Sequence, residues 1–216
     1  MKDINEHIKS LRSDYSKMEL NERDIHKSPF LQFEKWMKEA IDAEIIEPHA
    51  MTLSTVSIEL KPSARIVLLR DFGILGFTFY TNYTSRKGQD IAVHPDAALT
   101  FFWPQIERQV RIEGVLEKVS ASVSDAYFNS RPRESKIGAL VSEQSKSIQS
   151  RELLEEKMND LSTRFAGKEI SRPEYWGGYC LKPSVFEFWQ GRPSRLHDRI
   201  QFTLSEENWL IQRLSP

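Results

Sequence analysis

The sequence predicts a mainly β, α+β fold in which a closed or half-closed β-barrel carries packed helices. Segments with the two-residue period of strands gather in two clusters, at about residues 50–120 and 177–214, and helical patterns precede and separate them. None of the nine glycines fits GxGxxG or the P-loop spacing, and strands and helices do not alternate regularly. An antiparallel barrel is therefore favoured over a Rossmann-type sheet.

Charge and cysteine content restrict the class of protein. The 216 residues include 30 Lys and Arg against 31 Asp and Glu, and this net charge of −1 argues against a general nucleic-acid or membrane-surface binder. Cys180 is the only cysteine, which excludes an internal disulfide framework and a cysteine-cluster zinc site. No apolar run approaches the ~20 residues that span a bilayer. We expect a single domain over residues 1–216, located in the cytoplasm, with local anion sites.

The chain begins with helical patterns. Residues 1–25 are polar with weak helical spacing, so we expect a mobile arm or a marginal helix without a core face. Ser28 and Pro29 are typical of a helix start, and the helix continues to about residue 43. Its apolar stripe consists of Phe30, Phe33, Met37, Ala40 and Ile41.

Strand periodicity starts at residue 50, and three closely spaced segments predict an antiparallel meander. These strands are expected at 50–60, 64–70 and 76–82, with turns at 61–62 and 71–76. A short helix at 85–95 stops at Pro95. The remaining elements are strands at 96–103 and 108–120, helices at 122–131, 134–142 and 151–166, and strands at 177–191, 198–204 and 208–214.

Basic residues beside hydroxyl groups form two candidate phosphate sites. Ser85, Arg86 and Lys87 open the predicted short helix, where free amide groups and the helix dipole favour an anion. A solvated first turn is the alternative, although two cations at a helix N-terminus are unfavourable without an anion. The second candidate is Tyr127, Arg131 and Ser135, spaced in steps of four around Pro132. A core-edge tyrosine and a surface arginine remain equally open for that segment. Arg65 and Arg70 bracket a buried strand, which leaves their role ambiguous.

The segment FWQGRPSRLHDR holds the densest group of candidate residues, including Trp189. Strand alternation would place Arg195, His197 and Arg199 on one face and Asp198 on the other. Because three cations on one face repel each other, a bound anion or a carboxylate among them is expected. A structural histidine is the alternative.

Many short blocks in this order carry a resemblance over nearly the whole chain. The blocks are RIVLLR, FYTN, SRKG, ERQV, YFNSRPRES, IGALVSEQS, WGGY, FEFWQG, RLHDR and RLSP. With these blocks the chain resembles the pyridoxine (pyridoxamine) 5′-phosphate oxidase family. The resemblance implies an FMN-binding split β-barrel, active as a homodimer with FMN between subunits. It also implies oxidation of pyridoxine or pyridoxamine 5′-phosphate to pyridoxal 5′-phosphate with O2 as acceptor, giving H2O2, and ammonia from the amine.

The resemblance also implies the site residues, and no metal among them. Its flavin contacts fall on Arg65, Ile66, Val67, Leu68, Leu69, Arg70, Tyr80, Thr81, Arg86, Lys87, Gln109, Gln144, Ser145, Trp189 and Arg199. Its substrate contacts fall on Arg12, Ser13, Asp14, Tyr15, Arg70, Tyr127, Arg131, Ser135, Arg195, Leu196 and His197. Arg195 and His197 are the expected catalytic residues, which orient the ring and stabilise charge or move protons. Arg70 departs from the family pattern RxxLLK, which ends in lysine.

Other classes of function stay open beside this one. Phenazine-forming flavin oxidases look similar in fold and in RLHxR, although the full YFNSRPRES block favours the vitamin enzyme. A non-catalytic flavin or pyridoxal-phosphate carrier on the same barrel could dispense with Arg195 and His197.

Overall fold

The computed structural model describes residues 2–11 and 14–216, and it divides the chain into two compact units. Unit 1 contains the described residues up to Pro48 together with Thr100–Ile112 and Val185–Pro216, and unit 2 contains His49–Leu99 and Glu113–Ser184. The single domain expected over residues 1–216 stays a prediction. None of the helices in the described ranges has the length and apolar character needed to cross a bilayer.

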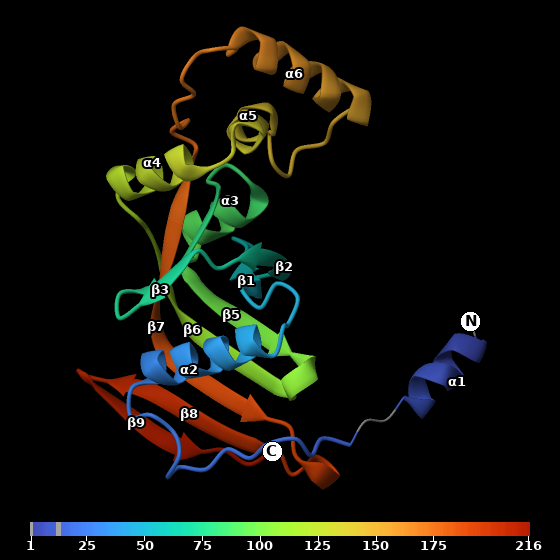
Figure 1. The fold of residues 1–216 in the computed structure, drawn as a ribbon, viewed down its shortest axis with the longest axis vertical. Coiled ribbons are helices and arrows are strands. Elements are labelled where there is room, and N and C mark those ends of the chain that lie inside the picture. Colours follow the sequence, from blue (N-terminus) through green and yellow to red (C-terminus); the bar gives the residue numbers. More distant parts are fainter. Residues whose placement is uncertain (1, 12–13) are drawn as a thin grey trace. The chain divides into compact units, whose positions relative to one another are not determined.

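The strands form an antiparallel sheet (Figure 1). The sheet order is β2-β1-β5-β6-β7-β4-β3, and β8 pairs with both β7 and β9. The bounds are β1 Ala50–Val56, β2 Pro62–Leu68, β3 Asp71–Gly73, β4 Gly76–Asn82, β5 Asp96–Trp103, β6 Arg108–Lys118, β7 Trp176–Gln190, β8 Asp198–Ser205 and β9 Asn208–Arg213. This half-closed antiparallel barrel with helices between its strand clusters confirms the predicted α+β fold.

Three helices of unit 2 contribute to one hydrophobic cluster, namely α4 Ala121–Ser130, α5 Arg133–Val141 and α6 Arg151–Arg164. The remaining helix, α3 Arg86–Val93, packs against β1. Phe128, Ile137, Val141, Ile170 and Trp176 form the buried cluster. The apolar side of α6, which has no buried residue of its own, packs against it beside α5 (Figure 1).

Unit 1 contains α1 Lys2–Ser10, α2 Pro29–Asp42 and two short 3-10 helices, Pro104–Ile106 and Pro193–Arg195. Ser28 is the N-cap of α2, as predicted, but its side chain makes no capping hydrogen bond. Phe33, Trp36, Met37 and Ala40 form the buried face, because they follow the i, i+3, i+4, i+7 spacing of one helix side. Ile41 is 57% exposed, so its place in the apolar stripe was predicted wrongly.

Residues 14–25 contribute to the core of unit 1. Leu20 and Ile25 are only 4% and 9% exposed. The backbone N–H of Leu20 donates to Asp198 Oδ2, and its carbonyl accepts from Arg213 Nη2. The prediction that residues 1–25 lack a core face is therefore wrong for this segment, since two isolated apolar residues in a polar stretch give no periodic signal.

The predicted meander is also wrong. β1 and β2 form the expected hairpin, with Leu53 opposite Arg65 and Thr55 opposite Ser63. The next strand, β4, pairs with β3 and β7 instead of β2. The residues 71–73, predicted as part of a turn, form β3. The alternation of polar and apolar residues along a strand indicates which side chains are buried, but it does not indicate which other strand pairs with it.

Candidate active site

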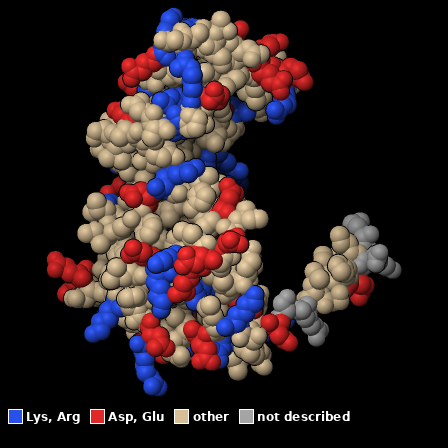
Figure 2. Space-filling model, viewed as in Figure 1, with Lys and Arg blue, Asp and Glu red and all other residues tan. Residues whose placement is uncertain are grey.

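Unit 2 contains a cavity of about 770 Å³ that gathers twelve of the predicted binding residues. Its lining residues are Arg65, Ile66, Val67, Leu68, Arg70, Tyr80, Thr81, Lys87, Tyr127, Ser130, Arg131, Pro132, Ser135, Gln144 and Trp176. The described lining includes four cations and no Asp or Glu. Figure 2 shows acidic and basic side chains mixed over the visible face, so the positive charge of the cavity is a local feature. Such a lining favours an anionic ligand.

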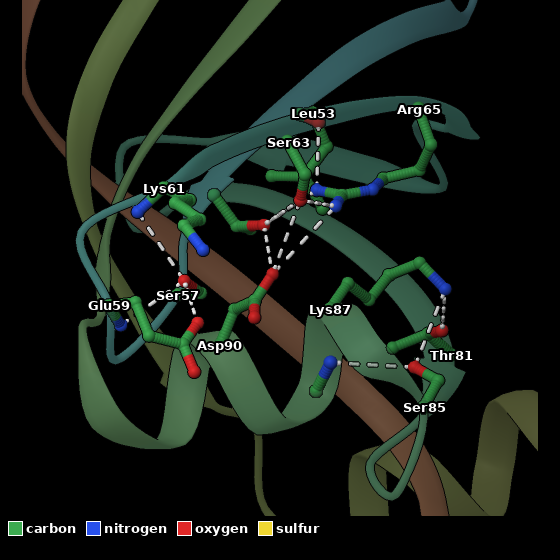
Figure 3. Close-up of polar contacts among 12 residues, drawn as sticks. Leu53, Ser57, Glu59, Lys61, Ser63, Arg65, Thr81, Ser85, Lys87 and Asp90 are labelled. Atoms are coloured by element: carbon green, nitrogen blue, oxygen red, sulfur yellow. Dashed lines mark hydrogen bonds and ion pairs between the residues drawn. The ribbon is translucent and has the colours of Figure 1, made fainter. Parts of the chain in front are cut away.

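Arg65, on β2, lines the cavity, and residues of the β1–β2 hairpin bind its guanidinium (Figure 3). Its Nη1 donates to the Leu53 carbonyl at 3.0 Å and to Thr55 Oγ1 at 2.8 Å, and its Nη2 donates to Ser63 Oγ. The register of β1 and β2 places all three acceptors within reach of one guanidinium. Burial lowers the pKa of Arg65, Asp90 opposes that effect and Arg86 adds to it. The guanidinium is therefore fixed before any ligand binds.

Lys87 lies in the first turn of α3 and is only 9% exposed. Its Nζ donates to Thr81 Oγ1 at 3.2 Å and to Ser85 Oγ at 3.5 Å (Figure 3). It also donates to Gln144 Oε1 at 3.2 Å. All three acceptors are neutral, and no described ion pair includes Lys87. Burial, followed by the positive charge of Arg65, lowers the pKa of Lys87. An anion would compensate both effects.

The start of α3 depends on a glycine. Ser85 caps the helix by accepting a hydrogen bond from the Gly88 N–H. A Cβ at Gly88 would lie 2.1 Å from the Tyr83 carbonyl oxygen, so only glycine permits this close approach. The predicted short helix with Ser85 at its start is thus confirmed, and its position is set by backbone packing.

Tyr127, Arg131 and Ser135 come together in the same cavity, as expected for a clamp. α4 ends at Ser130 and α5 starts at Arg133, so the chain bends at Pro132 between the two helices. The Tyr80 and Tyr127 rings stack with centroids 3.7 Å apart, and Arg131 Cζ lies 4.5 Å from the centroid of Trp176. The Trp176 ring therefore shields one side of the guanidinium from water.

Arg131 has an unsatisfied donor. Its Nη1 is the one buried side-chain nitrogen or oxygen in the described residues without a hydrogen-bond partner. Burial lowers the pKa of Arg131, with Tyr127 acting in the opposite direction and the positive charge of Arg70 lowering it further. Because an unpaired buried donor is costly, this nitrogen is best explained as a ligand contact.

Unit 1 contains a second cavity, of about 700 Å³. It is lined by Leu11, Asp14, Tyr15, Arg192, Ser194, Arg195 and His197. The His197 ring packs 4.7 Å from the Trp189 ring and 5.7 Å from the Tyr15 ring, measured between centroids. The cavity thus brings the two predicted catalytic residues together with part of the predicted arm.

The hydrogen bonding of His197 assigns its tautomer. Its Nδ1 accepts from the backbone N–H of Arg192 at 3.1 Å, so the neutral ring carries its proton on Nε2. Burial, followed by the positive charge of Arg195, lowers the pKa of His197, and Asp198 opposes this. If Nδ1 were protonated, its N–H would face the backbone N–H of Arg192, so two donors would point at each other. The ring is therefore a neutral Nε2–H donor near pH 7.

Arg195 and His197 do not lie on a strand, so the prediction that alternation aligns them with Arg199 is wrong. Pro193–Arg195 form a 3-10 turn with φ of +57° at Ser194 and +61° at Arg195, and β8 starts at Asp198. Pro193 fixes its own φ and lacks an N–H, which favours a turn over a continued strand. Arg199 instead pairs with the buried Glu187, at 2.9 Å from Nε and 3.1 Å from Nη2.

Several predicted residues line neither of these cavities. Arg86 and Leu196 are exposed, and the backbone N–H of Leu69 donates to the His49 carbonyl. Gln109, Ser145, Trp189 and Arg199 also lie outside the two linings. Arg12 and Ser13 lie outside the described residues. Sequence reasoning missed Ser130, Pro132, Trp176, Leu11, Arg192 and Ser194. Of these, Leu11 lies outside every sequence block quoted above, whereas the others lie within YFNSRPRES, WGGY or FWQGRPSRLHDR.

Comparison with known proteins matches both parts of the chain. A family model described as pyridoxamine 5′-phosphate oxidase matches residues 37–165, and one described as the pyridoxine 5′-phosphate oxidase C-terminal dimerisation region matches residues 176–216. A Cyanothece protein named pyridoxine/pyridoxamine 5′-phosphate oxidase is 53% identical, covering 97% of this chain and 98% of its own. A Burkholderia mallei protein of the same name is 52% identical, covering 97% and 99%.

Two solved structures share the fold. PhzG from Burkholderia lata, in complex with tetrahydrophenazine-1-carboxylic acid, has a TM-score of 0.88 at 26% identity and covers 94% of this chain and 100% of its own. A Nostoc punctiforme protein titled as pyridoxamine 5′-phosphate oxidase-related and FMN binding has a TM-score of 0.70 at 15% identity, covering 88% and 98%. The family models and the curated relatives cover both units and nearly the whole sequence. This chain therefore belongs to the pyridoxamine 5′-phosphate oxidase family.

Proposed function

We propose that this protein is an FMN-dependent oxidase that converts pyridoxine 5′-phosphate or pyridoxamine 5′-phosphate to pyridoxal 5′-phosphate, with O2 as electron acceptor. The alcohol and O2 give the aldehyde and H2O2. The amine, O2 and water give the aldehyde, H2O2 and ammonia. The observation that carries the proposal is the buried, unpaired Arg131 Nη1 in a cavity without a described acid. The names of the curated relatives support this class of substrate.

The cations of the unit 2 cavity form two pairs, which suits two phosphate groups. Arg65 lowers the pKa of Lys87, and Arg70 lowers the pKa of Arg131, so each pair shares one region of positive potential. Following the family resemblance, Arg65 and Lys87 would hold the FMN phosphate, and Arg70 and Arg131 the substrate phosphate. FMN, when bound, supplies the hydride acceptor and the route of electrons to O2.

The protein itself contributes binding and orientation. Tyr127 and Ser135 add hydroxyl donors to the guanidinium of Arg131, which together would hold a phosphate in a fixed position. In unit 1, Arg195 and the Nε2–H of His197 would orient the pyridine ring and stabilise charge, or move a proton, at the substrate oxygen or nitrogen.

We also propose that the protein is a homodimer, since residues 176–216 match a dimerisation region. In the family resemblance each FMN lies between subunits, so FMN should raise the midpoint of thermal unfolding of the native dimer by mass action. Light scattering with and without FMN tests this proposal. A monomer that binds FMN tightly contradicts it.

The experiment that tests the function is anaerobic reduction of the FMN-loaded protein. Pyridoxine 5′-phosphate should bleach the yellow colour, and air should restore it with formation of H2O2. Unphosphorylated pyridoxine should bleach it much more slowly, because Arg131 then stays unpaired. An FMN-loaded protein that pyridoxine 5′-phosphate does not reduce rejects the proposed reaction.

A phenazine-type flavin oxidase is the second candidate, favoured by the similarity to PhzG. The tricyclic acid named in that structure carries no phosphate, so it offers no dianion to Arg131. Faster anaerobic bleaching by a dihydrophenazine carboxylate than by pyridoxine 5′-phosphate would favour this candidate. A protein that binds FMN and is bleached by neither compound is the non-catalytic carrier.

A further inference from the structure

Asp90 is a buried carboxylate that lies behind the cavity wall. It is 6% exposed, belongs to α3 and is not among the cavity-lining residues. Thr55 Oγ1, itself 1% exposed, donates to Asp90 Oδ2 at 2.8 Å, and Ser63 Oγ donates to the same oxygen at 3.3 Å. Figure 3 shows the carboxylate pointing at this group of hydroxyls and at the end of the Arg65 side chain.

The two hydroxyls connect Asp90 to Arg65. Thr55 Oγ1 accepts from Arg65 Nη1 at 2.8 Å, and Ser63 Oγ accepts from Nη2. Direct contact between Arg65 Nη2 and Asp90 Oδ2 is longer, at 3.9 Å. Because the Thr55 proton points at Asp90, a lone pair of the same oxygen is left for the guanidinium. The carboxylate therefore fixes the direction of both hydroxyls.

Lys87 lies one turn earlier on α3, and no described hydrogen bond or ion pair joins it to this carboxylate. Residues three apart on a helix are neighbours and commonly form ion pairs. Here Lys87 binds only neutral oxygens, of Thr81, Gln144 and Ser85. The same short helix thus carries Lys87, which has no described acidic partner, and Asp90, whose carboxylate contacts the hydroxyls bound to Arg65.

We propose that Asp90 is a positioning residue that acts through Thr55 and Ser63 to orient Arg65 for the phosphate of the cofactor. This inference rests on the proposed function, in which Arg65 and Lys87 hold the FMN phosphate. Asp90 has no contact with the ligand in this scheme. Its effect on affinity comes from the fixed direction of the Arg65 guanidinium.

The sign of one substitution separates positioning from simple electrostatics. The negative charge of Asp90 repels a phosphate, so a purely electrostatic role predicts that Asp90→Asn strengthens FMN binding. A positioning role predicts the opposite, because a neutral amide oxygen holds both hydroxyls more weakly than the carboxylate oxygen that now accepts from them, and the amide NH2 group is a donor that can reverse their direction. Thr55→Val removes the connecting hydroxyl without changing net charge and should act in the same direction as Asp90→Asn.

The experiment is a fluorescence titration of the full-length apoprotein with FMN and with riboflavin, which lacks the phosphate. The ratio of the two Kd values reports the phosphate contribution alone. We expect Asp90→Asn and Thr55→Val to weaken FMN binding about tenfold while the riboflavin Kd changes less than twofold, in line with loss of one oriented charge-assisted contact. Asp96→Asn, which removes an exposed acid at the start of β5, is the matched control and should leave both Kd values unchanged.

Each other outcome has a distinct meaning. If Asp90→Asn weakens the binding of FMN and of riboflavin equally, Asp90 is a general structural residue and the proposal is overturned. The same holds if a lower midpoint of unfolding is the sole change in this variant. Tighter FMN binding by Asp90→Asn overturns it as well. A parent protein that binds FMN no more tightly than riboflavin overturns the proposed function first, and this inference with it.

Discussion

The cavities of the two units differ in how their positive charges are balanced. In unit 2, Arg70, Lys87 and Arg131 have no described ion-pair partner, and Arg131 has an unpaired buried nitrogen. In unit 1, Arg192 pairs with Glu19 at 3.0 Å and Asp198 at 3.5 Å, and Asp14 is part of the lining. Unpaired buried cations require an anionic ligand, whereas balanced ones can orient a polar group without a net charge.

The comparison assigns different tasks to the two cavities. The unit 2 cavity gains most from a phosphate dianion, because the ligand supplies the charge that the protein omits. In the unit 1 cavity the charge of Arg192 is already balanced and Arg195 is exposed to solvent, and the cavity offers a neutral imidazole and aromatic edges. Substitutions of the unpaired cations should therefore have the largest effects.

Arg131→Ala is the strongest test of this difference. Each charge-assisted hydrogen bond contributes about 1.5 to 3 kcal/mol, so loss of the fork should lower kcat/KM for pyridoxine 5′-phosphate by about a hundredfold or more. The effect should nearly vanish with unphosphorylated pyridoxine, and Arg131→Lys should recover part of the activity. Arg151→Ala, on an arginine whose side chain is 83% exposed, is the control in steady-state kinetics. Equal losses with both substrates would show that Arg131 does not contact the phosphate.

Arg70 should matter less than Arg131, because it is exposed and its charge is partly screened. We expect Arg70→Ala to lower kcat/KM for pyridoxine 5′-phosphate about tenfold, the effect of roughly 1.4 kcal/mol, and Arg70→Lys to keep much of the activity. Unphosphorylated pyridoxine should show a smaller loss. A kcat/KM for Arg70→Ala within twofold of the parent removes Arg70 from the substrate site.

His197 tests the balanced cavity. Its pKa lies below 6.5 because of burial and then the charge of Arg195, so Arg195→Ala should raise the pKa of His197. A folded-state pKa below the unfolded value means that the unfolded chain binds the proton first, so stability falls as pH drops through and below 6.5. The ring titration followed by NMR, with His197→Asn to assign the signal, measures both values. A parent pKa at or above 6.5 would contradict the neutral donor assigned here.

The paired charges on the surface of unit 1 should have the smallest effect. Glu22 binds Arg213 through two hydrogen bonds, which lower the pKa of Glu22 to about 2, yet the carboxyl is largely exposed. Glu22→Gln should therefore destabilise the protein by less than about 1 kcal/mol at pH 7. Its contribution is present above the unfolded pKa of 4.5 and is lost as pH falls towards 2. Urea unfolding of Glu22→Gln at pH 7 and pH 3, with Glu6→Gln as control, measures the change in the free energy of unfolding. A loss above about 2 kcal/mol at pH 7 contradicts the prediction.

The sequence by itself determined the elements that depend on neighbouring residues. The spacing of Phe33, Met37 and Ala40 predicted α2, and Ser85 with Pro95 bounded α3. The block YFNSRPRES predicted that Tyr127, Arg131 and Ser135 converge, and they line one cavity. Periodicity and capping act over a few residues, so these features can be recognised from the order of residues alone.

Only the tertiary structure decided which distant groups meet. In the structure β4 pairs with β7, and Arg195 and His197 lie before β8 instead of on a strand. The Asp90 carboxylate accepts hydrogen bonds from the hydroxyls that contact Arg65 and does not pair with Lys87. Whether a buried charge finds a partner depends on the residues that packing brings beside it from other elements. The unpaired nitrogen of Arg131 is therefore visible only in the fold, because its desolvation comes from the surrounding rings and helices and not from its neighbours in the chain.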